Sequence, residues 1–258
     1  MSVRQLFDLS GKVAVVTGAS RGLGLQMAKA LGEMGARLAI TARKADELDE
    51  AAAHLRAQGY EVLPIAGNLG ADGTADSLVD AVLACYGTID ILVNNAGTSW
   101  GAPAETYPDA AWHKVMGLNI NALFFLTREV ARRAMIPQQR GKIINIASIA
   151  GLGGNPPGIQ TIAYNTSKGA VVNLTHALAA EWGCHQINVN AICPGFFRSK
   201  MSGGLLDAIE PQIIAATPLQ RIGGEEDLQG AVVFLASDAS RHVTGQCLAV
   251  DGGASVVM

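Results

Sequence analysis

Short apolar runs rich in β-branched residues alternate with helical segments along almost the whole chain, and this rhythm constrains the fold most strongly. The runs predicted to be strands are 12–17, 37–42, 61–66, 89–93, 142–147, 187–193 and 246–250. The predicted helices are 25–35, 45–58, 72–86, 112–134, 163–182 and 225–237. Strands that alternate with helices form parallel sheets covered on both faces. Because no repeat or linker interrupts the rhythm, we expect one doubly wound α/β domain over 1–258.

Composition agrees with a large buried core and excludes several classes of partner. Of 258 residues, 49% are hydrophobic and 16% charged. The net charge is −3 with no basic block, which argues against nucleic acid or an anionic membrane surface as partner. No run approaches the roughly 18 apolar residues of a membrane span, and the first residues do not resemble a signal peptide. We therefore expect a cytoplasmic protein.

The cysteines and histidines show no pattern typical of a disulfide framework or a metal site. Cys85, Cys184, Cys193 and Cys247 form no CxxC pair and have apolar neighbours in sequence, so we interpret them as reduced core thiols. The five histidines have no ligand spacing, so no metal is expected.

The first predicted strand ends in a glycine-rich turn, GASRGLG, which leads into a helix. The three glycines are Gly18, Gly22 and Gly24. Strand, glycine-rich turn and helix are the context of a dinucleotide site, where glycines let the backbone approach a pyrophosphate at the helix N-terminus. The spacing is GxxxGxG rather than GxGxxG, and a turn without a ligand is the alternative.

The end of the second predicted strand indicates which dinucleotide is preferred. An acidic residue there would bind the ribose hydroxyls of NAD, but the sequence has Thr41 and Ala42, followed by Arg43 and Lys44. Arg21 lies in the glycine-rich turn as well. Guanidinium groups bind phosphate bidentately, so these residues favour the 2′-phosphate of NADP(H), with NAD(H) possible. Alternatively, Arg43 and Lys44 are merely solvated at a helix start.

Tyr164 and Lys168 stand four residues apart in a segment with helical periodicity. On a helix that spacing places both side chains on one face. A phenol has an ordinary pKa of about 10, and a neighbouring ammonium lowers it. The pair therefore suits reversible proton transfer to a carbonyl or hydroxyl oxygen, although a surface lysine lying along a tyrosine is the alternative.

Two further polar residues occupy unusual positions. Ser148 directly follows a predicted strand, at the edge of the sheet where ligands bind in open α/β folds. Asn119 lies inside the predicted helix 112–134, where its helix propensity is poor. It is either a hydrogen-bonded structural group or the site of a local helix distortion that exposes a carbonyl.

The segment 196–217 breaks the strand–helix rhythm just beyond the edge where a substrate would bind. It contains glycines, a proline and a weakly helical middle. We interpret it as a mobile substrate lid, with a static surface excursion as the alternative.

The motifs above resemble one known family. TGASRGLG at 17–24, NNAG at 94–97, Asn119, Ser148, YxxxK at 164–168 and the pair Pro194–Gly195 occur in this order. Together they resemble the short-chain dehydrogenase/reductase family, and the resemblance runs from residue 9 to residue 253. It implies a seven-stranded parallel Rossmann sheet and an oxidoreductase with a nicotinamide cofactor.

The resemblance also implies a catalytic tetrad of Asn119, Ser148, Tyr164 and Lys168. Ser148 would hydrogen-bond the substrate oxygen, and Tyr164 would exchange a proton with it. Lys168 would lower the pKa of Tyr164 and bind the nicotinamide ribose, while the main-chain carbonyl of Asn119 would hold a water. The implied cofactor residues are Gly18, Ser20, Arg21, Gly22, Leu23, Gly24, Arg43, Asn68, Leu69, Asn95, Ala96, Gly97, Tyr164, Lys168, Pro194 and Gly195.

Two positions depart from the family pattern. Asn68 stands where the family often has an aspartate near the adenine. Ser148 and Tyr164 are 16 residues apart, slightly more than usual, so the intervening loop is expected to reshape the substrate mouth.

The substrate is predicted from the residues around that mouth. Segments 90–108 and 112–119 resemble β-ketoacyl reductases of the rhamnolipid-pathway type, whereas the general layout resembles gluconate 5-dehydrogenase-type enzymes. The predicted wall of the substrate site is mostly apolar and consists of Trp100, Leu152, Gly153, Ile159, Phe196 and Phe197. Arg198 is the one nearby cation, and Ser148 is expected to face the reacting oxygen. An apolar wall favours an acyl or aryl ketone.

We therefore expect an NADPH-dependent ketone or β-ketoacyl reductase acting on a small molecule. The alternatives are a sugar-acid or secondary-alcohol dehydrogenase and, from another class, a catalytically silent NADP-binding regulator. Family members commonly form homotetramers through two long helices, and segments 112–134 and 163–182 are apolar enough for that, unless these faces are simply core.

Overall fold

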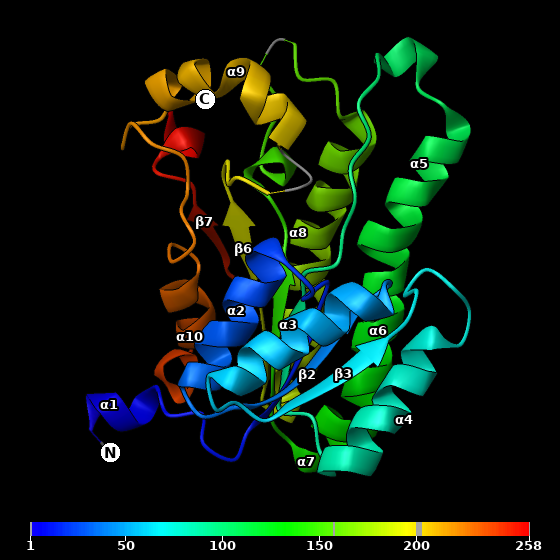
Figure 1. Cartoon of the computed structure of the whole chain (residues 1–258), viewed down its shortest axis with the longest axis vertical. Coiled ribbons are helices and arrows are strands. Elements are labelled where there is room, and N and C mark those ends of the chain that lie inside the picture. Colours follow the sequence, from blue (N-terminus) through cyan, green and yellow to red (C-terminus); the bar gives the residue numbers. More distant parts are fainter. Residues whose placement is uncertain (1, 157, 200–202, 258) are drawn as a thin grey trace.

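A seven-stranded sheet, with every neighbouring pair of strands parallel, forms the centre of the computed structural model, which describes residues 2–156, 158–199 and 203–257 (Figure 1). Its order is β3-β2-β1-β4-β5-β6-β7. The strands are β1 Val13–Thr17, β2 Arg37–Ala42, β3 Val62–Ala66, β4 Ile91–Asn94, β5 Gly141–Ile146, β6 Ile187–Pro194 and β7 Cys247–Val250. The order reverses between β1 and β4, and ligands bind outside the carboxyl ends of strands at such a switch point.

Helices cover both faces of this sheet. The helices of the described residues are α1 Val3–Leu6, α2 Gly22–Glu33, α3 Ala45–Ala57, α4 Thr74–Tyr86, α5 Asp109–Met116, α6 Leu123–Val130, α7 Ile136–Gln138, α8 Ile162–Trp182, α9 Gly203–Ala216 and α10 Gln229–Ala236. Two π-helical segments, Gly117–Ala122 and Ala131–Met135, flank α6. In Figure 1, α9 lies above the carboxyl end of β6, at the opposite end of the molecule from α1.

The strand β1 shows why the sheet is buried on both sides. All five of its residues are buried. Val13 and Val15 belong to a core cluster shared with α4, α6 and α8, whereas Ala14 and Val16 belong to one shared with α2, α3 and α10. Successive side chains of a strand point to opposite faces, so a continuous apolar run fills two cores at once.

The predicted fold class is confirmed, and each of the seven predicted strands is found within two residues of its expected bounds. The predicted helix 112–134 begins earlier, at Asp109, and the local distortion that was one of the two alternatives for Asn119 occurs as a π-helical segment. The short helix α1 was not predicted. Within the described part of the chain, none of the helices has both the length and the apolar character needed to span a membrane.

The interpretation of the cysteines as core residues is wrong for two of them. All four are free, but Cys85 and Cys184 are exposed, Cys247 is half-buried and only Cys193 is buried. Cys85 lies near the end of α4, where apolar sequence neighbours point to other faces of the helix. Sequence surroundings therefore misrepresent the burial of a helical residue.

Candidate active site

The glycine-rich turn after β1 has the tight geometry that a dinucleotide site requires. Gly18 and Gly22 have φ of +65° and +55°, a left-handed conformation that glycine adopts without strain. A Cβ on Gly18 would come within 2.9 Å of the Ala96 Cα, and one on Gly24 within 2.5 Å of the Asn95 Nδ2. The glycines thus allow the turn to pack directly against the segment after β4.

Hydrogen bonds from this segment hold the turn in place. The backbone N–H groups of Asn95 and Ala96 both donate to Thr17 Oγ1, each over 2.9 Å. The Asn95 side chain donates to the carbonyls of Thr17 and Gly18 over 2.9 and 3.1 Å. The carboxyl ends of β1 and β4 are therefore joined at the switch point.

The helix α2 begins directly at this turn, and its first residues fit an anionic group. Arg21 is the N-cap and makes no side-chain hydrogen bond to the first turn. The first N–H groups of a helix lack intrahelical partners and attract anions, the more so with the helix dipole behind them. A Cβ on Gly22 would meet only Ser199, at 3.9 Å, which leaves room above the turn. The residues present therefore fit a pyrophosphate.

The predicted 2′-phosphate cations lie close to one another. The backbone N–H of Ala19 donates to the Thr41 carbonyl over 3.2 Å, which places the turn beside the end of β2. Arg21 and Lys44 both bind the same carboxylate, that of Glu47, over 2.5 and 2.8 Å. Arg43 is exposed. Sequence reasoning did not identify Glu47.

The remaining predicted cofactor residues lie at the same carboxyl edge of the sheet. Ser20 and Leu23 are half-buried in and after the turn, and Gly97 follows β4. Asn68 is exposed after β3 and accepts from the Gly70 N–H over 3.3 Å, with half-buried Leu69 beside it. These residues share one edge because the carboxyl ends of all parallel strands lie on the same side of the sheet.

At the end of β6, Pro194 is buried and Gly195 follows it. A Cβ on Gly195 would come within 2.7 Å of the Asp251 Cβ. Glycine therefore permits the close approach of the chain after β7.

The structure brings Ser148, Tyr164 and Lys168 together. Ser148 begins a short 3-10 turn, Ile149–Gly151, and accepts from the Ala150 N–H over 3.1 Å. Tyr164 and Lys168 lie one turn apart on α8. A Cβ on Gly151 would come within 2.5 Å of the Lys168 carbonyl carbon, so glycine lets the 3-10 turn lie against α8. Sequence reasoning missed Gly151.

Lys168 is buried and sits beneath the phenol ring. Its Nζ donates to the Ile146 carbonyl over 2.6 Å and lies 5.5 Å from the centroid of the Tyr164 ring. Burial lowers the pKa of Lys168 to about 8, opposed by the nearby Cys193 thiol. The ammonium is therefore held in an environment that disfavours its charge.

The pKa of Tyr164 shifts in the opposite direction to the one expected from the lysine. Burial raises it above its ordinary value, a hydrogen bond with the Ser148 side chain lowers it, and Cys193 raises it. Desolvation of the phenolate is the largest of these causes and outweighs the hydrogen bond with Ser148. Cys193, at the end of β6, is a neighbour that sequence reasoning missed.

Asn119 connects three segments of the site through its side-chain amide. Its Oδ1 accepts from the Thr98 N–H over 2.8 Å, and its Nδ2 donates to the Thr98 carbonyl and to Ser167 Oγ. Ser167 in turn donates to the Tyr164 carbonyl over 2.8 Å. The π-helical segment thus links the chain after β4 to the first turn of α8. The role predicted for the Asn119 main-chain carbonyl stays a prediction.

Comparison with known proteins identifies the family. A family profile described as enoyl-(acyl carrier protein) reductase matches residues 18–255. Gluconate 5-dehydrogenase of Gluconobacter oxydans (strain 621H) is 43% identical over 262 residues, covering 99% of each protein. The rhamnolipids biosynthesis 3-oxoacyl-(acyl-carrier-protein) reductase of Pseudomonas aeruginosa is 39% identical, covering 96% of this chain and 97% of the relative.

The chain belongs to the short-chain dehydrogenase/reductase family. It is an NAD(P)-dependent oxidoreductase of that family. A solved structure, gluconate 5-dehydrogenase from Burkholderia cenocepacia J2315 in complex with NADP and tartrate, superposes with a TM-score of 0.94 at 35% identity and covers 100% of both chains.

In this short-chain dehydrogenase/reductase, the predicted substrate wall is only partly exposed. Trp100 and Leu152 are 47% and 45% exposed. Gly153 is exposed, and Ile159 and Phe196 are half-buried. Phe197 differs from the expectation: it is 6% exposed, belongs to the core beneath α2 and α10, and packs on Gly223. An isolated parallel β-bridge between Phe197 and Gly223 turns the Phe197 side chain inward.

The long loop between Ser148 and Tyr164 is tied to the start of α8 by an amide clasp of Asn155, Thr161 and Asn165. Asn155 Nδ2 donates to Thr161 Oγ1 over 2.8 Å and to Asn165 Oδ1 over 2.9 Å. Asn165 Nδ2 returns a bond to Asn155 Oδ1 over 3.1 Å, and Thr161 donates to Asn165 Oδ1 over 2.9 Å. These bonds hold Asn155 and Thr161 beside the first turn of α8, which carries Tyr164.

Segment 196–217 contains the helix α9, which is joined to the chain after β6 by ion pairs. Arg198 binds Asp207 over 2.8 Å and also binds Glu210. Leu206 and Ile213 of α9 are buried. Residues 200–202 of the predicted lid lie outside the described residues. No cluster that could hold a metal ion occurs among the residues described.

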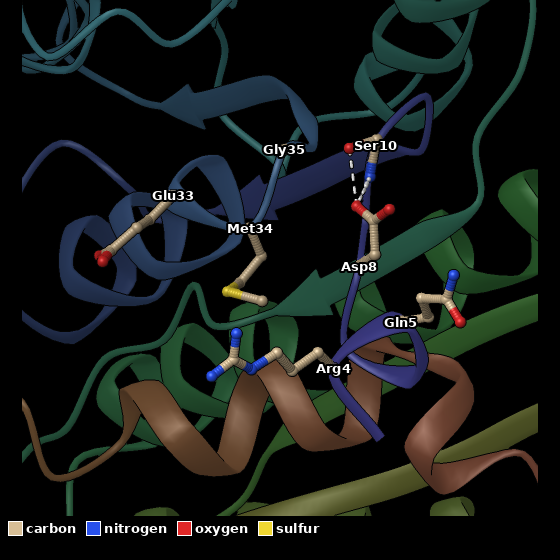
Figure 2. Close-up of a pocket in the computed structure, with 7 residues that line it drawn as sticks. All are labelled: Arg4, Gln5, Asp8, Ser10, Glu33, Met34 and Gly35. Carbon is tan, nitrogen blue, oxygen red and sulfur yellow. Dashed lines mark hydrogen bonds between the residues drawn. The ribbon is translucent and has the colours of Figure 1, made fainter. Parts of the chain in front are cut away.

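A hollow of about 450 Å³ lies at the opposite edge of the sheet (Figure 2). Its lining comes from α1, from the end of α2 and from the chain just before β1 and β2: Arg4, Gln5, Asp8, Ser10, Glu33, Met34 and Gly35. Asp8 accepts from the N–H and hydroxyl of Ser10, which lowers the pKa of its carboxyl. Because parallel strands begin at this edge, the hollow is remote from Ser148 and its neighbours.

Proposed function

We propose that the chain reduces a ketone to a secondary alcohol with NADPH, with Asn119, Ser148, Tyr164 and Lys168 as the catalytic tetrad. The observation that carries this proposal is the meeting of a buried serine hydroxyl and a half-buried tyrosine above a buried lysine, at the carboxyl edge of the sheet. Two hydroxyl donors at one point suit the oxygen of a carbonyl, on which negative charge develops as it is reduced.

Each of these side chains has a distinct role in the proposed reaction. The bound nicotinamide supplies the hydride. The raised pKa of Tyr164 keeps its phenol protonated at neutral pH, which is the form that donates a proton to the nascent alkoxide. Ser148 donates a hydrogen bond to the same oxygen, and Lys168 holds positive charge beneath the phenol and binds the cofactor ribose.

Three positive charges near the end of β2 support NADPH as the preferred cofactor. Arg21, Arg43 and Lys44 suit a 2′-phosphate, and β2 ends without the acidic residue that would bind the ribose hydroxyls of NAD. The solved relative from Burkholderia cenocepacia carries NADP. NAD(H) is a possible second cofactor. The remaining proposed cofactor contacts are those of the glycine-rich turn, 68–69, 95–97 and 194–195.

The exposed apolar side chains at the mouth support an acyl or aryl ketone as substrate. Trp100 follows β4 and Leu152 follows β5, so both stand at the carboxyl edge. The alternative is a sugar acid, supported by the 43% identity to a gluconate 5-dehydrogenase. A catalytically silent regulator is not favoured, since all four tetrad residues are present.

The domain organisation, the location in the cell and the assembly belong to the same proposal. We infer a single domain over 1–258, with segment 196–217 as its substrate lid, and a cytoplasmic location for the protein. We also infer a homotetramer formed through segment 112–134 and α8, on which Phe125 and Ile162 are 47% and 44% exposed. Sedimentation at micromolar concentration would reveal a tetramer, and a monomer would exclude this assembly.

The decisive experiment follows NADPH and NADH oxidation with a β-ketoacyl thioester and, separately, with 5-ketogluconate. Tyr164→Phe is the inactive control, and its cofactor affinity is measured alongside. Turnover of the thioester with NADPH that disappears in the variant would support the proposal. Turnover of only 5-ketogluconate would move the substrate class to sugar acids, and full activity of Tyr164→Phe would overturn the tetrad.

A further inference from the structure

Glu47 occupies the position between two cations that the proposed cofactor needs. It lies in the first turn of α3, whose N-cap is Lys44. Its two carboxylate oxygens are divided between two partners: Oε2 binds Arg21 Nη1 over 2.5 Å, and Oε1 binds Lys44 Nζ over 2.8 Å. One carboxylate therefore satisfies a residue of the glycine-rich turn and a residue beyond β2 at once.

This ion-pair cluster lies where a ribose 2′-phosphate would be recognised. Thr17 and Thr41 are paired across β1 and β2, so the glycine-rich turn and Arg43 continue from adjacent strand ends. A dinucleotide whose pyrophosphate lies at the N-terminus of α2 places its adenosine ribose toward the end of the second strand. The Glu47 carboxylate and a 2′-phosphate are both anions that accept hydrogen bonds from Arg21 and Lys44.

We propose that Glu47 weakens the preference for NADPH over NADH by competing with the 2′-phosphate of NADPH for Arg21 and Lys44. NADPH must displace the carboxylate from both cations, and the displaced carboxylate then remains near a phosphate of like charge. NADH lacks the phosphate and leaves the cluster intact. Glu47 thus narrows the preference for NADPH over NADH. The inference rests on the proposed use of NADPH.

The exposure of the cluster limits the size of this effect. The side chains of Arg21, Lys44 and Glu47 are 48%, 67% and 29% exposed. Ion pairs of this kind change an equilibrium by roughly 1.5-fold to fivefold each. Removing the competing charge is therefore expected to strengthen NADPH binding by roughly threefold to tenfold, with a smaller gain at high salt because exposed charges are screened.

The test is calorimetric titration of the cofactor-free protein with NADPH and with NADH, without substrate. Glu47→Gln keeps the shape of the side chain and removes its charge. The matched control is Asp46→Asn, which removes the same charge from an exposed neighbour in the same helical turn. The expected result is a threefold to tenfold rise in the ratio of Kd for NADH to Kd for NADPH in Glu47→Gln, with Asp46→Asn within twofold of wild type. A circular-dichroism melt checks that both variants fold.

A further variant, Arg21→Gln, separates failure of the inference from failure of the proposed cofactor. If Arg21→Gln lowers the ratio but Glu47→Gln leaves it unchanged or lowers it, competition by Glu47 is refuted and the phosphate site stands. An equal rise in Asp46→Asn would also refute competition, because it would reflect overall charge. If Arg21→Gln leaves the ratio unchanged, the phosphate is bound elsewhere, and both the assigned phosphate site and the inference fall.

Discussion

Replacing Lys168 by methionine is expected to stabilise the cofactor-free protein while abolishing its activity. Burial lowers the pKa of Lys168 from 10.5 to about 8, which corresponds to about 3 kcal/mol against the charged form. The methionine keeps the apolar stem but loses the hydrogen bond that the charged ammonium donates to the Ile146 carbonyl, worth about 1.5 kcal/mol. At pH 7 the free energy of unfolding should therefore rise by about 1.5 kcal/mol.

The pH dependence of this gain identifies its cause. The folded-state pKa of Lys168 is lower than the unfolded one, so between pH 8 and 10.5 the unfolded chain binds a proton that the folded chain does not. Wild-type stability from this group therefore rises with pH across that interval. The advantage of Lys168→Met should accordingly be full at pH 7 and nearly absent at pH 9.5.

Urea denaturation at both pH values and one protein concentration, without cofactor, measures this difference. The control is Lys114→Met, which replaces an exposed lysine on α5. A Lys168→Met protein less stable than wild type at pH 7, or a stability gap that is equal at both pH values, would refute the reasoning.

Three further predictions concern neighbouring parts of the molecule. Thr161→Val should raise KM for the ketone several-fold and leave the Kd of NADPH unchanged. Thr161→Ser keeps the hydroxyl of the clasp and should have the wild-type KM. Equal KM values in the two variants would contradict this prediction. Gly151→Ala should lower stability by about 1–3 kcal/mol in urea denaturation, because its Cβ meets the backbone of α8, while Gly154→Ala, with open space around it, should be close to neutral. Arg221 lowers the pKa of the Asp227 carboxyl to about 2, so this ion pair stabilises the fold above pH 3.8 and the stabilisation is lost as the pH falls through about 2. Asp227→Asn should remove this contribution. If acid titration followed by circular dichroism shows no difference between the variant and the wild type, the prediction is wrong.

The sheet and the proximity of Ser148, Tyr164 and Lys168 could be predicted because both depend on short-range patterns. Strands buried on two faces appear as continuous β-branched runs, so their bounds could be read to within two residues. Tyr164 and Lys168 lie on one helix, and helical spacing alone places them together. Ser148 joins them because every parallel strand ends at the same edge.

The electrostatics of the site could not be predicted, because they depend on contacts between distant segments. The direction of the Tyr164 pKa shift follows from how deeply the phenol is buried beside Cys193 on β6. The pairing of Arg21 with Glu47 joins residues 26 apart in the chain. Phe197 was misplaced for the same reason, since its burial depends on the later Gly223. Apolar character identifies a side chain that avoids water, but not the cavity that it fills.

Lys168 and the start of α2 hold charged or unpaired groups at a cost to stability, and we expect cofactor binding to reverse part of that cost. Lys168 carries its charge in a desolvated position, and α2 begins without a side-chain cap at its first turn. Both features disfavour the empty state and favour an anionic, hydrogen-bonding occupant. A ligand that binds only the folded state stabilises it by mass action. The same residues that weaken the empty protein should therefore make its thermal stability respond strongly to NADPH, and Lys168→Met, which removes one of these features, should show a smaller response.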